Sequence, residues 1–236
     1  MPLGPMHYLP LSAPFFAILV AVLAVVWVML EVGALSYAYM RIGLSPRGTM
    51  LVLLASLIGS YFNIPVADLP QRQIVSGQLI EFFGMQYVVP MVSSWPGTVI
   101  AVNVGGAVIP VLVSLYLCAR RGLWIQAAIA VLCVAALSHW LAHPVAGLGI
   151  AVPIFVPALV TAVVALILSR WNAPALAYVA GSCGTLIGAD LLNLDRLQGL
   201  GAPVASIGGA GTFDGIFLTG VVAVLIAGMT SPAPRH

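Results

Sequence analysis

Long apolar segments, separated by short polar connections, occupy almost the whole chain. Hydrophobic residues make up 62% of the sequence and charged residues only 6%, and all eight basic residues are arginines. A soluble domain typically has about 25% charged residues, so this chain has too few to cover a surface exposed to water. The sequence therefore predicts a protein surrounded mainly by lipid, and its net charge of +2 gives no sign of a nucleic-acid partner.

Seven of the apolar segments approach the length of about 20 residues that a helix needs to cross a bilayer. We therefore predict an all-α polytopic membrane protein that forms a single transmembrane domain over residues 1–236. The seven segments are about Pro14–Tyr37, Thr49–Val66, Thr98–Ala119, Gly122–Leu141, Ile150–Ser169, Ala175–Leu194 and Phe213–Met229.

The arginines predict the orientation of these segments. Six of the eight fall in connections on one side or in the C-terminal tail, and two, Arg72 and Arg196, fall on the other side. Because positive charge is retained on the cytoplasmic side, we expect the N-terminus outside and the C-terminus inside a cytoplasmic (inner) membrane. The first segment lacks the features of a cleaved signal peptide, and we interpret it as a retained helix.

One connection, residues 67–97, is long. It contains the β-prone stretches QRQIV and MQYVV, with a turn signal at Ser76-Gly77. We expect a short external β-hairpin between the second and third segments.

Two aspartates, Asp190 and Asp214, lie in apolar sequence near the outer ends of the sixth and seventh segments. A carboxylate at the centre of a bilayer costs at least about 2.5–3.5 kcal/mol, so it marks a functional site by default. Asp214 can in part be explained as the N-terminal cap of the last helix. Asp190 lies near the end of a helix, where the dipole disfavours a carboxylate. The pair is therefore the candidate catalytic site.

Other polar residues fall at outer ends of the predicted helices. Asn63, Asn103 and His139 are candidate ligands for a substrate or an ion, although Asn103 alone suits an ordinary bond between helices. His139 and His143 have the i, i+4 spacing of two metal ligands on one helical face, but they lack the glutamate of a zinc-protease motif. The three cysteines show neither metal nor disulfide spacing, and no cofactor motif is present.

The whole chain resembles a family of prokaryotic integral membrane proteins catalogued as domain of unknown function 1614. The similarity lies in LIGSYFNIPVADLP (57–70), EFFGMQYVVP (81–90), WPGTVIAVNVGGAVIPVLVSLYL (95–117), GTLIGADLLNL (184–194) and GAPVASIGGAGTFDGIFLTG (201–220). This resemblance implies no particular catalytic residue.

The segment GGAGTFDGIFLTGVV is also similar to the Gly-x-Gly-Asp segment of presenilin and signal-peptide-peptidase-like intramembrane aspartyl proteases. That resemblance implies peptide hydrolysis by Asp214 together with an aspartate on the preceding helix, here Asp190. The present motif is Gly-Thr-Phe-Asp, and Ala189 rather than tyrosine precedes Asp190.

Three functions remain open from the sequence. The first is a di-aspartyl intramembrane hydrolase. The second is a small ion- or proton-coupled transporter that uses the same polar cluster. The third is an accessory subunit of a larger membrane complex. The corresponding partners are the lipid bilayer, a membrane-protein or peptide substrate, and a homo-oligomer or larger assembly.

Overall fold

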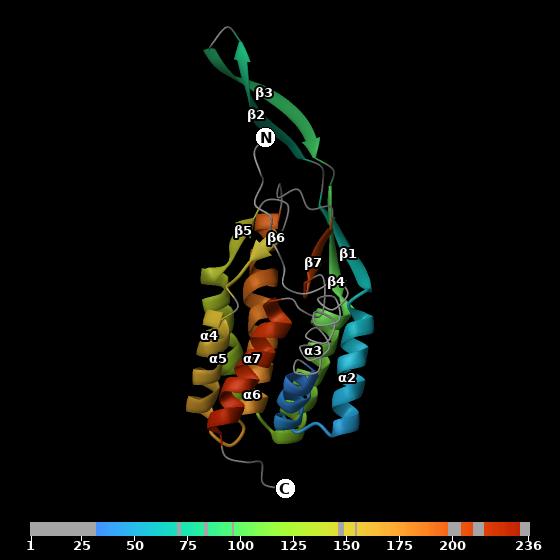
Figure 1. Cartoon of the computed structure of the whole chain (residues 1–236), viewed down its shortest axis with the longest axis vertical. Coiled ribbons are helices and arrows are strands. Elements are labelled where there is room, and N and C mark those ends of the chain that lie inside the picture. The colour runs from blue at the N-terminus through green and yellow to red at the C-terminus, as the bar shows by residue number, and fades with distance from the viewer. Residues whose placement is uncertain are drawn as a thin grey trace, which may run out of the picture.

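The computed structural model describes residues 32–69, 72–82, 85–95, 97–145, 149–153, 155–197, 204–209 and 215–231. Helices lie side by side in one half of the molecule, and the strands gather at one end of this bundle (Figure 1). The helices are Val32–Arg41, α2 (Pro46–Gly59), α3 (Ile109–Arg121), α4 (Trp124–Leu141), α5 (Phe155–Leu168), α6 (Ala173–Val179) and α7 (Gly215–Thr230).

The strands form three small sheets. A three-stranded sheet has the order β1 (Asn63–Leu69), β4 (Thr98–Asn103), β7 (Val204–Ile207), with β1 antiparallel and β7 parallel to β4. The hairpin of β2 (Arg72–Phe82) and β3 (Met85–Trp95) extends away from the helices (Figure 1). A short pair, β5 (His143–Val145) and β6 (Gly149–Ala151), follows α4.

Two of the long helical segments are interrupted. Strand β4 leads directly into the π-helix η1 (Val104–Val108) and then into α3. Helix α6 continues through two π-helical segments, η2 (Ala180–Gly184) and η3 (Leu186–Asp190), and ends in the 3₁₀-helix η4 (Leu191–Leu197). Single π-helical turns inside α-helices are rare, and those that occur often lie at functional sites.

Glycine lets the interrupted helix approach its neighbours closely. A Cβ atom at Gly181 would lie 2.9 Å from the Cα atom of Gly220 in α7, and a Cβ atom at Gly188 would lie 2.2 Å from the carbonyl oxygen of Ala135 in α4. Glycine therefore allows backbone-to-backbone contact, which is a common way for helices to associate in membranes.

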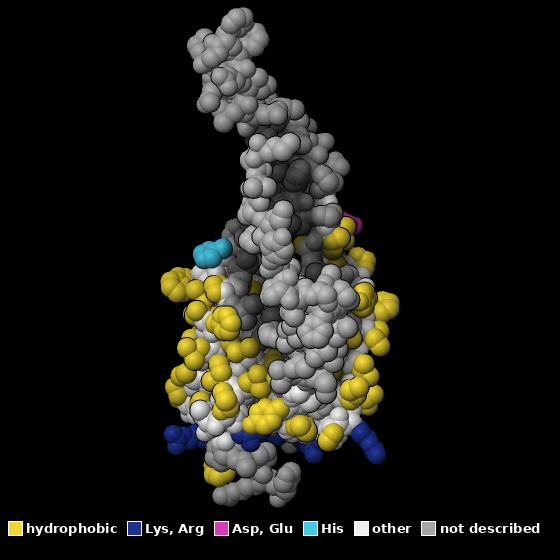
Figure 2. Space-filling view, viewed as in Figure 1, with side chains coloured by type: hydrophobic (Ala, Val, Ile, Leu, Met, Phe, Trp, Pro, Cys, Tyr) yellow, Lys and Arg dark blue, Asp and Glu magenta, His cyan; other side chains and the backbone are white. Residues whose placement is uncertain are grey.

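Apolar side chains cover the outside of the helical bundle, as Figure 2 shows for one face. Trp124 and Trp140, at the two ends of α4, are 53% and 77% exposed. They are sixteen residues apart, which corresponds to about 24 Å along a helix at about 1.5 Å per residue. Exposed tryptophans at two levels with apolar residues between them are typical of membrane interfaces.

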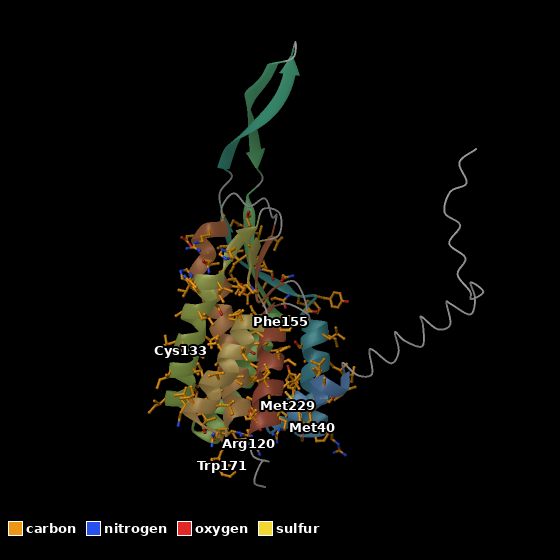
Figure 3. The ribbon with its side chains drawn as sticks, turned by 60° about the vertical axis from the view of Figure 1, so that its left-hand side comes forward. Met40, Arg120, Cys133, Phe155, Trp171 and Met229 are labelled. Carbon is orange, nitrogen blue, oxygen red and sulfur yellow. The ribbon has the colours of Figure 1, made fainter. Side chains whose placement is uncertain are left out.

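The described arginines are concentrated at the end of the bundle opposite the strands (Figure 2). Arg120 and Trp171 lie together at this end (Figure 3). Within the described residues, the arginines of this end are Arg41, Arg47, Arg120, Arg121 and Arg170, while the acidic residues Asp68, Glu81, Asp190 and Asp195 belong to the strands or to η3 and η4.

Two arginines of this end also hold the bundle together. Arg121 donates hydrogen bonds to the carbonyl oxygen of Ile42 at 2.8 Å and to Oδ1 of Asn172 at 2.9 Å. Arg41 donates to the carbonyl oxygens of Gly228 and Ser231 at the end of α7. These cations satisfy carbonyl groups that otherwise lack partners at helix ends and in loops.

The prediction of an all-helical fold with seven spans is only partly confirmed. Among the described residues, three helices are long and apolar enough to cross a membrane, namely Val104–Arg121, Trp124–Leu141 and Ala173–Arg196. A fourth span results if helix Val32–Arg41 and α2, which are bent by 120° relative to each other, count as one. Helix α5 is apolar but shorter than these spans. The apolar helices thus suggest a membrane protein.

The three-stranded sheet corrects two predicted helices. The second segment was expected to remain helical to Val66, but α2 ends at Gly59 and β1 follows. The third was expected to be helical from Thr98, but residues 98–103 form β4. Short apolar runs suit either a buried strand or a helix, and here pairing with distant strands selects the strand.

A hairpin is present in the segment where the sequence predicted one. It is formed by two strands of eleven residues each, so it is longer than expected. The predicted turn at Ser76-Gly77 is wrong, because both residues lie within β2 and pair with Met91 and Pro90. Glycine weakens a strand, but here the pairing of β2 with β3 continues through it.

Candidate functional site

A buried asparagine connects α2, β1 and η1 where the strands meet the helices. Asn103 is 0% exposed. Its side-chain amide donates to the carbonyl oxygen of Ser60 at 2.9 Å and to Oδ1 of Asn63 at 3.1 Å. Its Oδ1 accepts a hydrogen bond from the backbone N–H of Gly106 at 2.8 Å, which caps η1. Both donors and the acceptor of Asn103 are therefore engaged by the protein.

Asn63 extends this network toward the surface. It is exposed on β1, and its Oδ1 also accepts a hydrogen bond of 2.7 Å from the hydroxyl of Ser206 in β7. The three strands of the sheet therefore each contribute one side chain, Asn63, Asn103 and Ser206. The sequence predicted that Asn63 and Asn103 would gather, and the structure joins them directly.

Two glycines link this network to Asp190. A Cβ atom at Gly106 would lie 1.9 Å from the carbonyl oxygen of Gly208, so the two backbones are in direct contact. Gly208 and the following Gly209 have φ angles of 90° and 75°, in the region that glycine adopts readily. This conformation follows β7 directly and turns the chain toward η3.

Asp190 lies at the end of η3 and is half-buried. Its Oδ2 accepts a hydrogen bond of 2.7 Å from the backbone N–H of Gly208. Asp190 thus binds the glycine turn that follows β7, and its own helix continues beyond it as η4 to Leu197.

Asp214 lies outside the described residues, so its distance from Asp190 is not defined. The described residues on either side of it are informative. Gly208, six positions earlier, bonds to Asp190, and Ile216, two positions later, belongs to one apolar cluster with Ala107, Leu186 and Ile207. Leu186 is in the same π-helix as Asp190. Gly208 and Ile216 therefore both lie next to the segment that carries Asp190.

The two histidines do not occupy one helical face. His139 lies in the last turn of α4, whereas α4 ends at Leu141 and His143 begins strand β5. The expected i, i+4 helical arrangement is therefore wrong, because Ala142 is extended, with a ψ angle of 124°. Among the described residues, no group of three or more His, Cys, Asp or Glu side chains could hold a metal ion.

Three residues of this region were not singled out by sequence reasoning. Ser206 and Gly208 lie in a connection without a strong apolar pattern. Ser206 joins the site because it pairs with Ala101, about one hundred residues earlier, and Gly208 joins it because its N–H binds Asp190. Asn193 is 0% exposed. Its side-chain amide donates to the carbonyl oxygens of Gly188 and Ala189, the two residues before Asp190. Its signal in the sequence was an asparagine within the sixth apolar segment, three positions after Asp190.

A family model described as Protein of unknown function (DUF1614) matches residues 57–226. The matched region contains Asn63, Asn103, Asp190, Ser206 and Asp214. No curated protein matches the chain. No solved structure matches it either.

Proposed function

Since the chain belongs to the DUF1614 family of proteins of unknown function, we propose a function from the arrangement of its own residues. It is a membrane-embedded hydrolase that uses Asp190 and Asp214 as an acid–base pair on water. Its substrate is a peptide bond in an apolar segment. The site lies at the end of the bundle where the strands meet the helices.

We propose that the chain crosses a bacterial-type inner membrane seven times, with the arginine-rich end in the cytoplasm. The exposed tryptophans at both ends of α4 and the apolar belt between them support a membrane-spanning bundle. The described arginines at the end opposite the strands support the orientation. The glycine turn and Asp190 then face the outer half of the bilayer.

The observation that carries the hydrolase proposal is the position of Gly208. Its N–H binds Asp190, and the same connection leads to Asp214, which immediately precedes the first residue of α7. Two carboxylates within about 4–6 Å cannot both ionise easily, so one keeps a proton. Such a pair contains both a base and an acid near neutral pH.

The chemistry requires only these two groups and water. The ionised carboxylate takes a proton from water as the water oxygen forms a bond to the carbonyl carbon of the peptide. The protonated carboxylic acid then donates its proton to the amide nitrogen, and the C–N bond breaks. One carboxylic acid and one amine are released, and the pair again holds a single shared proton.

The test uses the full chain purified in detergent and an apolar helical peptide that reports cleavage by fluorescence. Asp190→Asn and Asp214→Asn should each abolish cleavage. Asp195→Asn is the matched control, because Asp195 is exposed on η4, only five positions from Asp190, and its loss should leave cleavage unchanged. Full cleavage by either of the first two variants would exclude the acid–base pair.

A second function, proton- or cation-coupled transport, is favoured by a different observation. The helix that carries Asp190 is interrupted by two π-helical segments. The buried hydroxyls of Thr185 in this helix and Ser138 in α4 have no hydrogen-bond partner among the described residues. π-Helical turns are frequent at functional sites, and these two hydroxyl oxygens are available as ligands for an ion.

Reconstitution in liposomes distinguishes the two functions. A carrier should move protons or sodium when a gradient is imposed, and Asp190→Asn should stop this flux. In that case neither the wild type nor Asp195→Asn should cleave the reporter peptide. A hydrolase should cleave the peptide and leave the gradient intact.

A further inference from the structure

Among the described residues, neither outer edge of the β2–β3 hairpin pairs with another strand. Each of its strands contains eleven residues, and they pair with one another from Arg72↔Trp95 to Phe82↔Met85. In the described structure the hairpin extends away from the helices (Figure 1). An isolated two-stranded hairpin is marginally stable in water, and a long free edge is a template for pairing with another strand. An additional strand would therefore stabilise the hairpin.

The sequence of β2 is symmetric by residue type about its central residue, Gly77. At equal distances from Gly77 stand Ser76 and Gln78, Val75 and Leu79, Ile74 and Ile80, Gln73 and Glu81, and Arg72 and Phe82. Polar residues thus match polar ones and aliphatic residues match aliphatic ones, and at the ends a cation matches an aromatic ring. A two-fold interface requires this property, because residue i meets residue j while j meets i.

The two strands of the hairpin differ in their free edges. Pro90, at the centre of β3, pairs with Gly77. A proline in a sheet is placed with its missing donor on the free side of an edge strand. The free edge of β3 therefore lacks its central donor. Two opposed residues of an antiparallel pair direct their backbone groups either toward each other or both outward. Gly77, which pairs with Pro90, therefore directs its N–H and carbonyl groups to the free edge of β2, a strand without proline.

We infer that two copies of this chain pair through the free edges of β2. The two β2 strands run antiparallel about a two-fold axis at Gly77, and together with both β3 strands they form a four-stranded sheet. Gly77 of one copy lies opposite Gly77 of the other, and Val75 lies opposite Leu79. In detergent the two helical bundles lie at opposite ends of this sheet.

Cysteine cross-linking of the full chain in detergent tests this register. In a background where Cys118, Cys133 and Cys183 are replaced by serine, Gly77→Cys should form a disulfide dimer on oxidation, because the Cα atoms of directly opposed residues are about 5.5 Å apart. Val75→Cys alone should not, but a mixture of Val75→Cys and Leu79→Cys should. No dimer with Gly77→Cys, or equal dimer formation by Val75→Cys alone, would overturn the antiparallel pairing.

The strength of association provides a second test with a matched control. Leu79→Lys should raise the dissociation constant of the dimer by about tenfold, since it removes two cross-strand apolar contacts related by the two-fold axis. Val88→Lys is the control, because Val88 lies opposite Leu79 on β3 but outside the proposed interface. Analytical sedimentation should show a weaker dimer for Leu79→Lys and an unchanged dimer for Val88→Lys. Equal weakening by both, or a wild type that remains a monomer, would contradict the interface.

Discussion

Asn103 and Asp190 belong to one network but have different roles. The side-chain amide of Asn103 uses both of its N–H donors and its oxygen in hydrogen bonds within the protein. Asn103 thus connects α2, β1 and η1 through hydrogen bonds. Asp190 is the acidic residue of the network and is half-buried. The functional proposal therefore depends on Asp190 and not on Asn103.

Replacing Asn103 by alanine should lower the stability of the protein. The change leaves the N–H of Gly106 and the carbonyl oxygen of Ser60 without this partner, at a cost of about 1–3 kcal/mol for each group that stays unsatisfied. Thermal unfolding in detergent measures the effect as a lower midpoint. Asn63→Ala should have a smaller effect, because Asn63 is exposed and water can replace its bonds. An unchanged midpoint for Asn103→Ala would show that this connection is not needed.

Grouping of the polar residues was predictable from the sequence, but their contacts were not. Asn63, Asn103 and Asp190 were placed at one end of the bundle because each falls near the outer end of an apolar segment. The bond from Gly208 to Asp190 depends on a tight glycine turn after β7. That strand is recognisable only through Val99↔Val204 and its neighbouring pairs, which join parts of the chain that are distant in sequence.

At the scale of the elements, the helices were predicted better than the strands. The fourth predicted segment, Gly122–Leu141, nearly coincides with α4, Trp124–Leu141. The sheet was missed because β4, with the sequence TVIAVN, is apolar enough to be the start of a helix. Its β-branched residues favour a strand, and this preference prevails where β1 and β7 supply partners on both sides.

Gly188→Ala should separate α4 from the helix that carries Asp190. The added Cβ atom would lie 2.2 Å from the carbonyl oxygen of Ala135, and a backbone atom cannot move aside as a flexible side chain can. We expect a cost of about 1–3 kcal/mol, as for other overpacked sites, together with loss of the activity assigned to Asp190. Thermal unfolding and the peptide-cleavage assay measure the two effects.

Gly33→Ala is the matched control for this change. Gly33 lies in helix Val32–Arg41, and a Cβ atom there would meet nothing within 4 Å among the described residues. Alanine is also the better helix former, so the midpoint should stay the same or rise. A Gly188→Ala protein as stable as Gly33→Ala would mean that the close contact between the helices is dispensable.

At the scale of the whole molecule, the distribution of charge predicts which end faces the cytoplasm. A single cysteine in place of Arg170 should be protected from a membrane-impermeant thiol reagent in intact cells. A single cysteine in place of Asp195 should react, because Asp195 lies on η4 near the strand end. Both positions are exposed, and the native cysteines are replaced in both proteins. The reverse labelling pattern would invert the orientation.

The central claim is that Asp190 and Asp214 form one site. An experimental structure of the full chain in a lipid nanodisc measures this most directly, through the distance between the two carboxyl groups. We expect them within about 6 Å, the range in which two carboxylates change each other's protonation. A separation of more than about 10 Å, with no movement that could close it, would contradict the acid–base pair, because groups that far apart cannot share a proton.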